Sequence, residues 1–394
     1  MGNRPTVDVL MPEKTIVILG STGSIGRQTL DVAACHRERL RVVGLAAGRD
    51  AAGLQAQAKE WGVTAVALAD DVAAQHLAAG SDLHVHAGAE GLCALVRELR
   101  ADLVVAAISG GAGLPAILAA LEAGSDVALA NKEPLVTAGN LVTQTAARCG
   151  AQLLPIDSEI SAVWQCLRAE NRRDVEKVLL TASGGPFAEC EAGALVHVTP
   201  EQALAHPTWR MGPKVTVDSA TLMNKGFEIF EIKCLFGLEF RQIEAIIHPQ
   251  SVIHSAVQFR DGSAMAQMGR PDMRVPIQFA LSYPERWQSD VPRMDLPVLE
   301  QLTFGRPDAG RFPCLRLARE AGEAGGSYPA VLSAADEVAV DAFLRGRLRF
   351  TDIPRVLERT LEAHERFPVA TLAEVRRAEG WGQAEALHLV ATLR

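Results

Sequence analysis

The sequence predicts an α/β protein, and three observations carry that prediction. Strand-like apolar runs alternate with helical patterns through residues 14–150, which is typical of a parallel sheet with helices on both faces. The first run, residues 14–19, leads directly into a glycine-rich turn. Further on, an Asp-Gly turn separates two apolar runs, and residues 314–394 have helical periodicity. We therefore expect an N-terminal Rossmann-like parallel sheet, a central α+β domain with a mixed sheet, and a small C-terminal helical bundle.

Length and composition exclude several classes of protein. The 394 residues are enough for two or three domains, and the 48% of hydrophobic residues is enough for substantial cores. The net charge of −8 and the lack of a basic run argue against a nucleic-acid partner. No apolar run approaches the roughly 18 residues that span a membrane, so we expect no membrane partner. The seven cysteines form no CxxC pair, which favours reduced thiols in the cytoplasm.

The N-terminal residues show no apolar core of a signal peptide. Residues 1–10 are expected to be a disordered extension, because Met11 lies just before the first strand and could itself be a start. Met1-Gly2 with Thr6 matches a short myristoylation pattern, which we interpret as accidental.

The first strand continues into Gly20 to Gly26 (GSTGSIG), followed by a helical pattern. Glycines in such a turn let the backbone approach a pyrophosphate, and the helix N-terminus faces its charge. The spacing is GxxGxxG rather than the more usual GxGxxG, so the motif gains its weight from the strand and helix around it. The prediction is a dinucleotide site; the alternative is a plain turn between a strand and a helix.

Further strands and helices follow in alternation. The expected strands are residues 41–46, 63–68, 103–108 and 126–130, and the expected helices lie near residues 51–61, 71–79, 89–100 and 114–123. Two segments that follow strands, residues 109–111 (SGG) and 131–133 (NKE), are expected to border the same cleft.

The end of the second strand bears on the choice of nucleotide. It reads Ala47-Gly48-Arg49-Asp50. An acid there binds the ribose of NAD, whereas an arginine favours the extra phosphate of NADP. With both present the prediction leans to NADP, and the alternative for Arg49 is a solvated loop charge.

Asp157-Ser158-Glu159 lies where an apolar strand, residues 151–156, gives way to a helix, residues 160–167. Ligands of α/β proteins bind at this edge of the sheet, and paired carboxylates suit a hard ion such as Mg²⁺ or Mn²⁺. The alternative is a helix start with Ser158 as N-cap and Glu159 in the first turn.

Two later segments suggest a phosphate site and a lid. Ser183-Gly184-Gly185 follows the strand 178–182 and can offer a hydroxyl and backbone N–H groups to a phosphate, or can be an ordinary turn. A capping box at Thr199 and Gln202 starts a short helix. The loop 206–213 carries Trp209 and Met211, which suggests a lid, although the tryptophan could be a core residue.

Residues 214–217 (KVTV) are expected to form a strand that leads into a helix through residues 222–235. Ser219 at the helix start, with Asn224 and Lys225 behind it, makes a phosphate site. Asn224 and Glu228 are four apart and share a helix face. The alternative is that Ser219 caps the helix and Lys225 pairs with Glu228 on the surface.

The remaining elements are predicted from apolar pattern. Strands are expected at residues 246–259 and 264–268 and a helix at 274–282, with His248 and His254 as structural residues. Residues 284–313, which contain five prolines, are expected to be a linker. The final helices are expected at residues 315–321, 330–344, 353–364 and 372–393, with a capping box at Thr371 and Glu374 and with Ser327 and Glu337 on the surface.

Seven motifs in this order resemble 1-deoxy-D-xylulose 5-phosphate reductoisomerases over nearly the whole chain. They are GSTGSIG at 20–26, AGRD at 47–50, NKE at 131–133, DSE at 157–159, SGGPF at 183–187, HPTWRMG at 206–212 and DSATLMNKGFE at 218–228. The resemblance implies an NADPH-binding domain at residues 1–150, a catalytic metal- and substrate-binding domain at 151–283 with the lid at 206–213, a linker at 284–313 and a helical bundle at 314–394.

The resemblance also implies an activity. Such enzymes rearrange 1-deoxy-D-xylulose 5-phosphate and reduce the product with NADPH to 2-C-methyl-D-erythritol 4-phosphate. They require a divalent metal, with Mg²⁺, Mn²⁺ or Co²⁺ as candidates, and are typically cytoplasmic homodimers.

The residue roles that the resemblance implies fall into four sets. Metal ligands would be Asp157, Glu159 and Glu228, and catalysis would rest on these together with Lys132. Substrate contacts would be Lys132, Ser158, Glu159, Ser183, His206, Trp209, Ser219, Asn224, Lys225 and Glu228. NADPH contacts would be Thr22, Gly23, Ser24, Ile25, Gly48, Arg49, Asp50, Asn131 and Gly212.

Asp50 departs from the asparagine common in the family and could weaken the preference for NADP over NAD; Pro134 is a second departure. Two alternative functions stay open from the sequence. One is an NADP-dependent dehydrogenase of a phosphorylated aldehyde or amino-acid precursor, which needs no three-acid metal site. The other is an NADP-sensing regulator without turnover.

Overall fold

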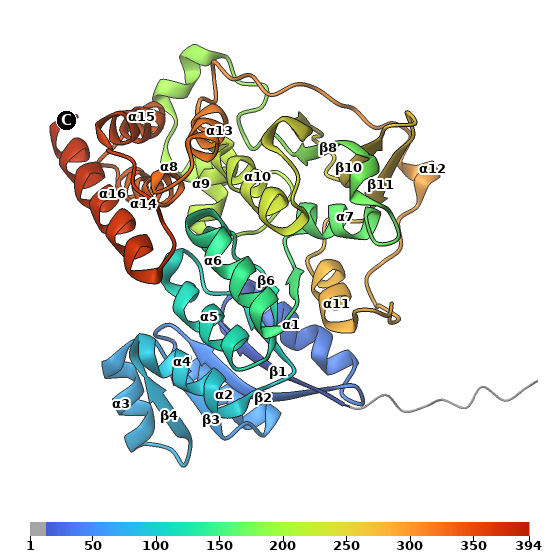
Figure 1. Ribbon diagram of the computed structural model, residues 1–394, viewed down its shortest axis with the longest axis vertical. Helices are drawn as coiled ribbons and strands as arrows, with labels where there is room; N and C mark the ends of the chain where they lie inside the picture. Colours follow the sequence, from blue (N-terminus) through green and yellow to red (C-terminus); the bar gives the residue numbers. More distant parts are fainter. Residues whose placement is uncertain (1–12, 394) are drawn as a thin grey trace, which may run out of the picture.

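The computed structural model describes residues 13–393 and shows two sheets with helices packed around them (Figure 1). The expected N-terminal extension, residues 1–10, the match to a myristoylation pattern and Met11 all lie outside the described residues. Among the helices that the structure describes, none is both long and apolar enough to cross a membrane.

The larger sheet has seven parallel strands in the order β4-β3-β2-β1-β5-β6-β7, which confirms the predicted Rossmann-like sheet. The strands are β1 Lys14–Leu19, β2 Leu40–Ala47, β3 Ala65–Leu68, β4 His84–Ala87, β5 Leu103–Ala106, β6 Asp126–Leu129 and β7 Leu153–Pro155. Strand β4 was not predicted, because its sequence HVHA has little apolar content and the strand lies half-exposed at the sheet edge.

Helices cover both faces of this sheet. Because successive side chains of a strand point to opposite faces, Ile16 and Ile18 of β1 lie in one core and Val17 and Leu19 in the other. The first core is covered by α1 Ser24–Cys35, α2 Ala51–Trp61, α3 Asp71–Ala79 and α11 Arg274–Ser282. The second is covered by α4 Gly88–Leu99, α5 Leu114–Glu122 and α6 Glu133–Cys149.

Helix α6 was not predicted from the sequence. It begins just after Lys132, so that Lys132 and Glu133 lie at a helix start directly beyond β6. Pro134 lies in the first turn, where its missing N–H is not needed, and Gly150 ends the helix in the left-handed conformation. The departure at Pro134 is therefore compatible with the local structure.

The second sheet is mixed, as expected, with the order β11-β10-β8-β9. Its strands are β8 Val175–Ala182, β9 Ile243–Ile247, β10 Ile253–Phe259 and β11 Ala264–Met268. The prediction of one continuous strand over 246–259 was wrong. A turn at His248 to Ser251 divides it, and the buried His248 ring accepts hydrogen bonds from the backbone N–H groups of Val252 and Ile253.

The prediction of a strand at residues 214–217 was also wrong. These residues lie in the helix α9 Pro213–Thr221, which is followed by α10 Met223–Phe236. The β-branched residues favoured a strand, but Pro213 at the helix start and the burial of Thr216 and Val217 favour the helix. Leu222, with φ of 62°, makes the sharp break between the two helices.

The remaining helices of the central part are α7 Ser158–Cys166 and α8 Pro200–Leu204. Helix α8 starts with the predicted capping box at Thr199 and Gln202. Short 3₁₀ segments are η1 Gly111–Gly113, η2 Arg172–Asp174, η3 Ala192–His197, η4 Phe240–Gln242 and η5 Phe350–Asp352.

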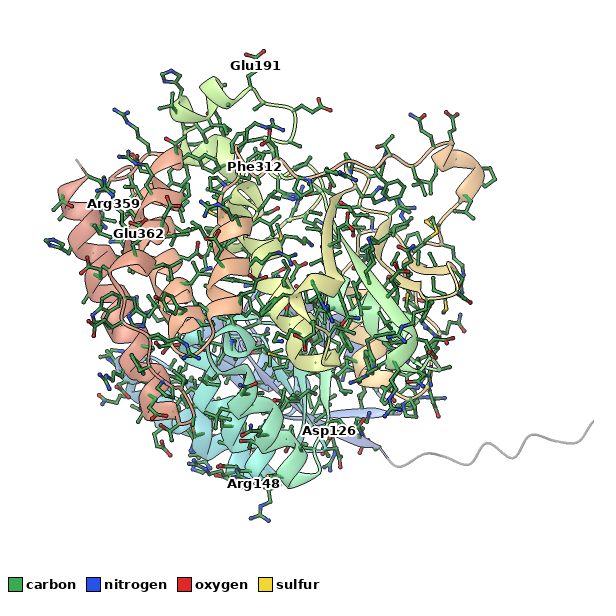
Figure 2. The ribbon with its side chains drawn as sticks, turned by 45° about the horizontal axis from the view of Figure 1, so that its top comes forward. Asp126, Arg148, Glu191, Phe312, Arg359 and Glu362 are labelled. Carbon is green, nitrogen blue, oxygen red and sulfur yellow. The ribbon has the colours of Figure 1, made fainter. Side chains whose placement is uncertain are left out.

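The C-terminal region is helical, as predicted. Residues 284–313 hold one short helix, α12 Leu296–Leu299, and are followed by α13 Cys314–Ala324, α14 Tyr328–Leu344, α15 Ile353–Ala363 and α16 Leu372–Thr392. Arg359 and Glu362 of α15 point outward (Figure 2), whereas Val356 and Leu361 are buried. These helices share one apolar core with α10 and β8, so they support the central domain directly.

Two surface predictions for this region had different outcomes. Glu337 is exposed, but Ser327 is fully buried. The hydroxyl of Ser327 hydrogen-bonds His364 Nε2 at 2.7 Å, which satisfies its polar group inside the bundle.

Truncation of Phe343 tests the shared core. Its side chain is 1% exposed and packs edge to face against Phe350 with ring centroids 5.8 Å apart. We expect Phe343→Ala to lower the free energy of unfolding by about 3–5 kcal/mol in urea titrations, because it leaves a cavity. Leu387→Ala, which removes a side chain that is 53% exposed, is the matched control and should lower it by less than about 1 kcal/mol. Equal losses for the two variants would contradict the burial described here.

Candidate functional site

A cavity of about 360 Å³ lies at the carboxyl ends of the sheet strands, between them and the helices α7, α9 and α10. It is lined by many of the predicted site residues: Gly23, Ser24, Ile25, Asn131, Lys132, Asp157, Ser158, Glu159, Ser183, His206, Trp209, Gly212, Ser219, Asn224, Lys225 and Glu228. Thr22, Gly48, Arg49 and Asp50 do not line it.

Three carboxylates from two parts of the chain meet in this cavity. Asp157 is the N-cap of α7 and accepts a hydrogen bond from Glu159 N at 3.3 Å, so the cap is Asp157 and not Ser158 as the alternative had it. Glu159 lies in the first turn of α7, and Glu228 projects from α10. One oxygen from each of the three lies within 4.8 Å of the others. Oxygen ligands at this spacing are the donor set that Mg²⁺ and Mn²⁺ take.

Two buried lysines surround the carboxylates. Lys132 Nζ lies 2.7 Å from Asp157 Oδ2 and 3.2 Å from Glu228 Oε1. Lys225 Nζ lies 2.8 Å from Glu159 Oε1 and also contacts Glu228 Oε2. The pairing of Lys225 with Glu228 is therefore real, but it is buried in the cavity wall and does not lie on the surface.

Asn224 and Ser158 complete the polar contacts of the acids. Asn224 accepts a hydrogen bond from Lys132 Nζ at 2.8 Å and donates one to Glu228 Oε1 at 2.6 Å. The Ser158 hydroxyl donates to Glu159 Oε2. Each acid is thus held in one orientation by neighbours from other elements, which preorganises the site for a cation.

The electrostatic surroundings shift the pKa values of Glu228 and Glu159 in opposite directions. The pKa of Glu228 is raised to about 8, mainly by burial and then by the nearby Glu159 and Asp157 carboxylates, while Lys225 and Lys132 act to lower it. Burial also acts to raise the pKa of Glu159, but Lys225 and the hydrogen bonds of Lys225 and Ser158 lower it to about 2. Burial disfavours the Lys132 ammonium, yet Asp157, Glu228 and Glu231 raise its pKa well above the ordinary value.

Glu231 is a buried acid close enough to the site to interact with Asp157 and Glu228, and the sequence analysis missed it. It lies one helical turn beyond Glu228 on α10, is fully buried, and has no hydrogen-bond partner at either carboxylate oxygen. Burial and the Asp157 carboxylate raise its pKa well above the ordinary value. With Asp157, Glu159 and Glu228 ionised, these three acids outnumber the two lysines by one charge, and a divalent cation that displaces the Glu228 proton would offset that charge. The sequence signal that could have identified Glu231 was its position three residues after Glu228, on the same face of the helix.

A second part of the cavity is built to bind an anion. His206 Nδ1 accepts hydrogen bonds from the backbone N–H groups of Thr208 (3.1 Å) and Trp209 (2.9 Å), so the ring proton lies on Nε2. Nε2 therefore donates to Ser183 Oγ at 3.0 Å, and Gly185 N donates to the same oxygen at 3.1 Å. The hydroxyl proton of Ser183 remains free to point into the cavity. Burial lowers the pKa of His206, which favours this neutral form.

Ser219 lies beside this serine, but not where the sequence placed it. It is in the last turn of α9 and does not start or cap a helix. A Cβ on Gly185, whose φ is 67°, would lie 2.9 Å from Ser219 O, so glycine allows the Ser183–Gly185 turn to approach α9 closely. The start of α10 at Met223 brings Asn224 and Lys225 to the same pocket, where the first N–H groups of a helix favour an anion.

The glycine turn forms the other wall. Gly20 has φ of 88°, and a Cβ there would lie 2.4 Å from Ala107 O on the neighbouring strand end. A Cβ on Gly26 would lie 2.2 Å from Gly20 O. Both positions therefore require glycine, and they hold the N-terminus of α1 at the cavity, as the dinucleotide prediction expects.

Asn131 and the residues after β2 flank the glycine turn. Asn131 Nδ2 donates to Gly110 O at 2.8 Å and to Ile108 O, which ties the ends of β5 and β6 together. Asp50 is the N-cap of α2 and accepts from Gly53 N at 2.9 Å. Arg49 is 88% exposed and lies 3.2 Å from Asp70. Arg49 and Asp50 therefore lie beyond the cavity, at the end of the strand next to β1.

The predicted lid loop borders the cavity through Trp209, Arg210, Met211 and Gly212. Trp209 is half-buried, with its ring centroid 6.2 Å from that of His254, so it is neither a core residue nor fully exposed. Gln28 and Met273 also line the cavity and were missed, because no sequence motif marks them.

Lys214 belongs to a second buried cluster, whose Glu133 and Asp218 also line the cavity. Its Nζ lies 2.6 Å from Asp218, 2.7 Å from Asp336 and 3.6 Å from Glu133. These contacts join α9 to α14 and α6, so Lys214 fixes the helices around the site.

Comparison with known proteins identifies a consistent family. The family model described as 1-deoxy-D-xylulose 5-phosphate reductoisomerase matches residues 16–139, and the model of its C-terminal domain matches residues 153–236. A third model, described as the DXP reductoisomerase C-terminal domain, matches residues 268–385.

Curated relatives agree. A 1-deoxy-D-xylulose 5-phosphate reductoisomerase of Moorella thermoacetica is 52% identical over 376 residues, covering 95% of this chain and 97% of the relative. One of Chlorobium chlorochromatii is 48% identical over 373 residues, covering 94% and 98%.

Two solved structures also match. A reductoisomerase of Zymomonas mobilis in complex with NADPH has a TM-score of 0.90 and 41% identity, covering 96% of this chain and 99% of that chain. A DOX-P reductoisomerase in complex with NADPH, fosmidomycin and magnesium has a TM-score of 0.92 and 38% identity, with the same coverage.

The raised pKa of Glu228 predicts how divalent-cation affinity depends on pH. A proton on Glu228 competes with the ion, so below a pKa of about 8 each bound ion must displace that proton. We expect Mn²⁺ affinity to rise by up to about tenfold per pH unit from roughly pH 6 and to level off above the pKa. Mn²⁺ titration followed by electron paramagnetic resonance measures it. Glu228→Gln should bind more weakly and with a flatter profile; a wild-type affinity that is constant across this range would contradict the assignment.

Proposed function

The chain belongs to the 1-deoxy-D-xylulose 5-phosphate reductoisomerase family, and from this membership we propose which of its residues carry out the reaction. It is an NADPH- and divalent-metal-dependent oxidoreductase that converts 1-deoxy-D-xylulose 5-phosphate to 2-C-methyl-D-erythritol 4-phosphate in the non-mevalonate isoprenoid pathway. The observation that supports the assignment of residues is the convergence of three carboxylates and two lysines between an anion pocket and a dinucleotide turn.

Asp157, Glu159 and Glu228 are the proposed metal ligands. Their oxygens converge within 4.8 Å of one another, a donor set that suits a divalent ion. When bound, the ion polarises the carbonyl and hydroxyl oxygens of the substrate as a Lewis acid, and NADPH supplies the hydride.

Lys132 and Lys225 hold the acids and face the substrate. Because the neighbouring carboxylates raise the pKa of Lys132, it is held as the ammonium form and donates hydrogen bonds to them. Lys132 thereby orients Asp157, Glu228 and Asn224 toward one point. Ser158 contributes by fixing the Glu159 carboxylate.

The substrate phosphate is proposed to bind at Ser183, Ser219, Asn224 and Lys225. Ser183 Oγ already accepts two hydrogen bonds, so its proton is directed to a phosphate oxygen. The lysine and the start of α10 add positive charge at the same place. Anchoring the phosphate positions the reacting carbons at the carboxylates and lends binding energy to the chemical step.

NADPH is proposed to bind along the glycine turn. Thr22, Gly23, Ser24 and Ile25 would contact the pyrophosphate at the start of α1, while Gly48, Arg49 and Asp50 would face the adenosine end beyond β2. Asn131 and Gly212 would lie at the nicotinamide end, where they border the cavity. Arg49 is placed to meet a 2′-phosphate, and Asp50 is engaged as a helix cap.

His206 and Trp209 are proposed to close the site. His206 fixes the start of the loop 206–213 through the Thr208 and Trp209 N–H groups and holds Ser183 with its other nitrogen. Phosphate binding at Ser183 is thus linked to the position of the lid, and a closed lid keeps water from the reacting carbons.

We propose the domain division 1–150, 151–283, 284–313 and 314–394 for this chain, and a cytoplasmic homodimer as its state. The free thiols of all seven cysteines favour a reducing compartment. Strand β11 is a sheet edge whose Met265 is 41% exposed, which favours association there. Light scattering of the purified protein tests the dimer.

The two alternative functions leave the carboxylate site unexplained. Neither a simple dehydrogenase nor a nucleotide sensor needs three converging acids beside a phosphate pocket, so neither is favoured.

Glu228→Gln should abolish turnover, because it removes one metal ligand while keeping the side-chain volume. We expect loss of activity by at least about 10³-fold, with the NADPH dissociation constant nearly unchanged. Absorbance loss of NADPH with 1-deoxy-D-xylulose 5-phosphate and Mg²⁺ or Mn²⁺ measures turnover. Glu60→Gln on the exposed face of α2 is the matched control and should retain activity. Full activity of Glu228→Gln would refute its role as a ligand.

Ser183→Ala tests the phosphate pocket. Loss of a hydrogen bond to a charged phosphate should reduce kcat/KM for the substrate by about 10- to 100-fold. Mn²⁺ affinity in the absence of substrate should not change, since Ser183 does not touch the carboxylates. The double variant Ser183→Ala with His206→Gln should lose less than the product of the two single losses, because His206 acts in part through the Ser183 hydroxyl and in part through the lid loop. Additive losses would show that the two residues act separately.

A further inference from the structure

A second cluster of metal-binding side chains lies outside the cavity. It consists of His84 and His86 on β4 and Glu98 on α4. His84 Nδ1 lies 3.3 Å from Glu98 Oε1, and His86 Nε2 lies 3.1 Å from Glu98 Oε2. One ligand atom from each of the three side chains lies within 4.8 Å of the others.

The local fold explains why these side chains meet. His84 and His86 are two residues apart on a strand, so both side chains point to the same face of the sheet. Helix α4 packs over that face, and Gly91 allows a close approach, because a Cβ there would lie 2.8 Å from the backbone carbon of His86. Glu98 is seven residues after Gly91, two helical turns further along the same face of α4. The helix therefore brings Glu98 to the start of β4.

The distances suit a tetrahedral transition-metal site. Zinc bonds to histidine nitrogen and carboxylate oxygen at about 2.0–2.2 Å, which places tetrahedral ligand atoms roughly 3.3 Å apart. Each histidine nitrogen lies at about that distance from one oxygen of Glu98, 3.3 Å for His84 and 3.1 Å for His86, and the three ligand atoms lie within 4.8 Å of one another, so small side-chain adjustments would bring them to one ion. The centroids of the two imidazole rings lie 4.4 Å apart, with the ring planes tilted by 48°, so protonation of both would bring two like charges together.

The hydrogen bonding of His86 also favours a bound metal ion. Its side chain is only 13% exposed, and its Nε2 atom is buried without a hydrogen-bond partner although Glu98 is near. A buried ring nitrogen without a partner is unfavourable unless another group takes its lone pair. A metal ion between the three side chains would do so.

We propose that His84, His86 and Glu98 form a binding site for a borderline divalent ion such as Zn²⁺, distinct from the three-carboxylate site. Two imidazoles and one carboxylate select such ions, whereas oxygen ligands alone suit Mg²⁺ and Mn²⁺. The ion leaves a coordination position for water.

The location assigns the site a structural role. β4 is the outer strand of the seven-stranded sheet (Figure 1), and His84 is its first residue, while Glu98 is next to the last residue of α4. The cluster thus lies toward the amino ends of the strands, opposite the edge that carries the cavity. An ion there clamps the outermost strand to the helix that covers it, and it takes no part in turnover.

Zinc content in the presence of excess Mg²⁺ tests the proposal. The protein is dialysed against micromolar Zn²⁺ with millimolar Mg²⁺, which occupies the carboxylate site, and bound zinc is measured by atomic absorption. The wild type should hold one more zinc ion per chain than His84→Gln/His86→Gln or Glu98→Gln. Zn²⁺ should also raise the Tm of the wild type and leave that of both variants unchanged.

His76→Gln is the matched control. His76 is an exposed histidine on the helix α3, which packs against the same sheet, and it lies outside the cluster. It should bind zinc as the wild type does. NADPH oxidation with the substrate and Mg²⁺ should be the same in all four proteins, which separates this site from the proposed catalytic one. Equal zinc content in the wild type and in both cluster variants would overturn the proposal and leave the three residues as an ordinary ion pair.

Discussion

The repulsion between buried carboxylates is the constraint on which the catalytic region depends. Two like charges 4.8 Å apart repel each other by ~3–4 kcal/mol at an effective dielectric constant of ~20. Asp157, Glu159 and Glu228 are held at this spacing inside the protein, with Glu231 beside them. Lys132 and Lys225 offset part of the repulsion, the raised pKa values of Glu228 and Glu231 reflect the remainder, and a divalent ion that displaces the Glu228 proton would balance it.

The fold keeps these groups together by supporting each from a separate element. Lys132 and Asp157 follow the neighbouring strands β6 and β7, so the sheet sets their separation. Glu228 comes from α10, whose apolar side chains lie in the core shared with the C-terminal helices. Lys214 ties α9 to α14 and α6 through Asp218, Asp336 and Glu133. The C-terminal helices thus contribute to function by fixing α9 and α10 while they contact none of the reacting groups.

Much of this arrangement could be predicted from the sequence, and the failures have physical reasons. Strongly periodic segments, the glycine turn and the capping boxes carry local signals. From these signals the parallel N-terminal sheet, the mixed second sheet and most of the cavity residues were predicted correctly. Residues 214–217 were assigned to a strand because β-branched residues favour one locally, whereas burial against α10 and α14 decides for a helix. Ser219 was consequently placed at a helix start. Glu231, Gln28 and Met273 were missed since their importance arises only when distant segments meet, and β4 was missed because an edge strand needs little apolar sequence.

The proposed convergence of the three acids on one cation can be observed directly. Crystals of the protein with NADPH and Mn²⁺, measured at the manganese absorption edge, would locate the ion by anomalous scattering. The account predicts a single site in the cavity with Asp157, Glu159 and Glu228 oxygens at bonding distance, about 2.0–2.3 Å, next to the nicotinamide ring. An ion bound elsewhere, with the Glu228 carboxylate still paired only with Lys132 and Lys225, would contradict it.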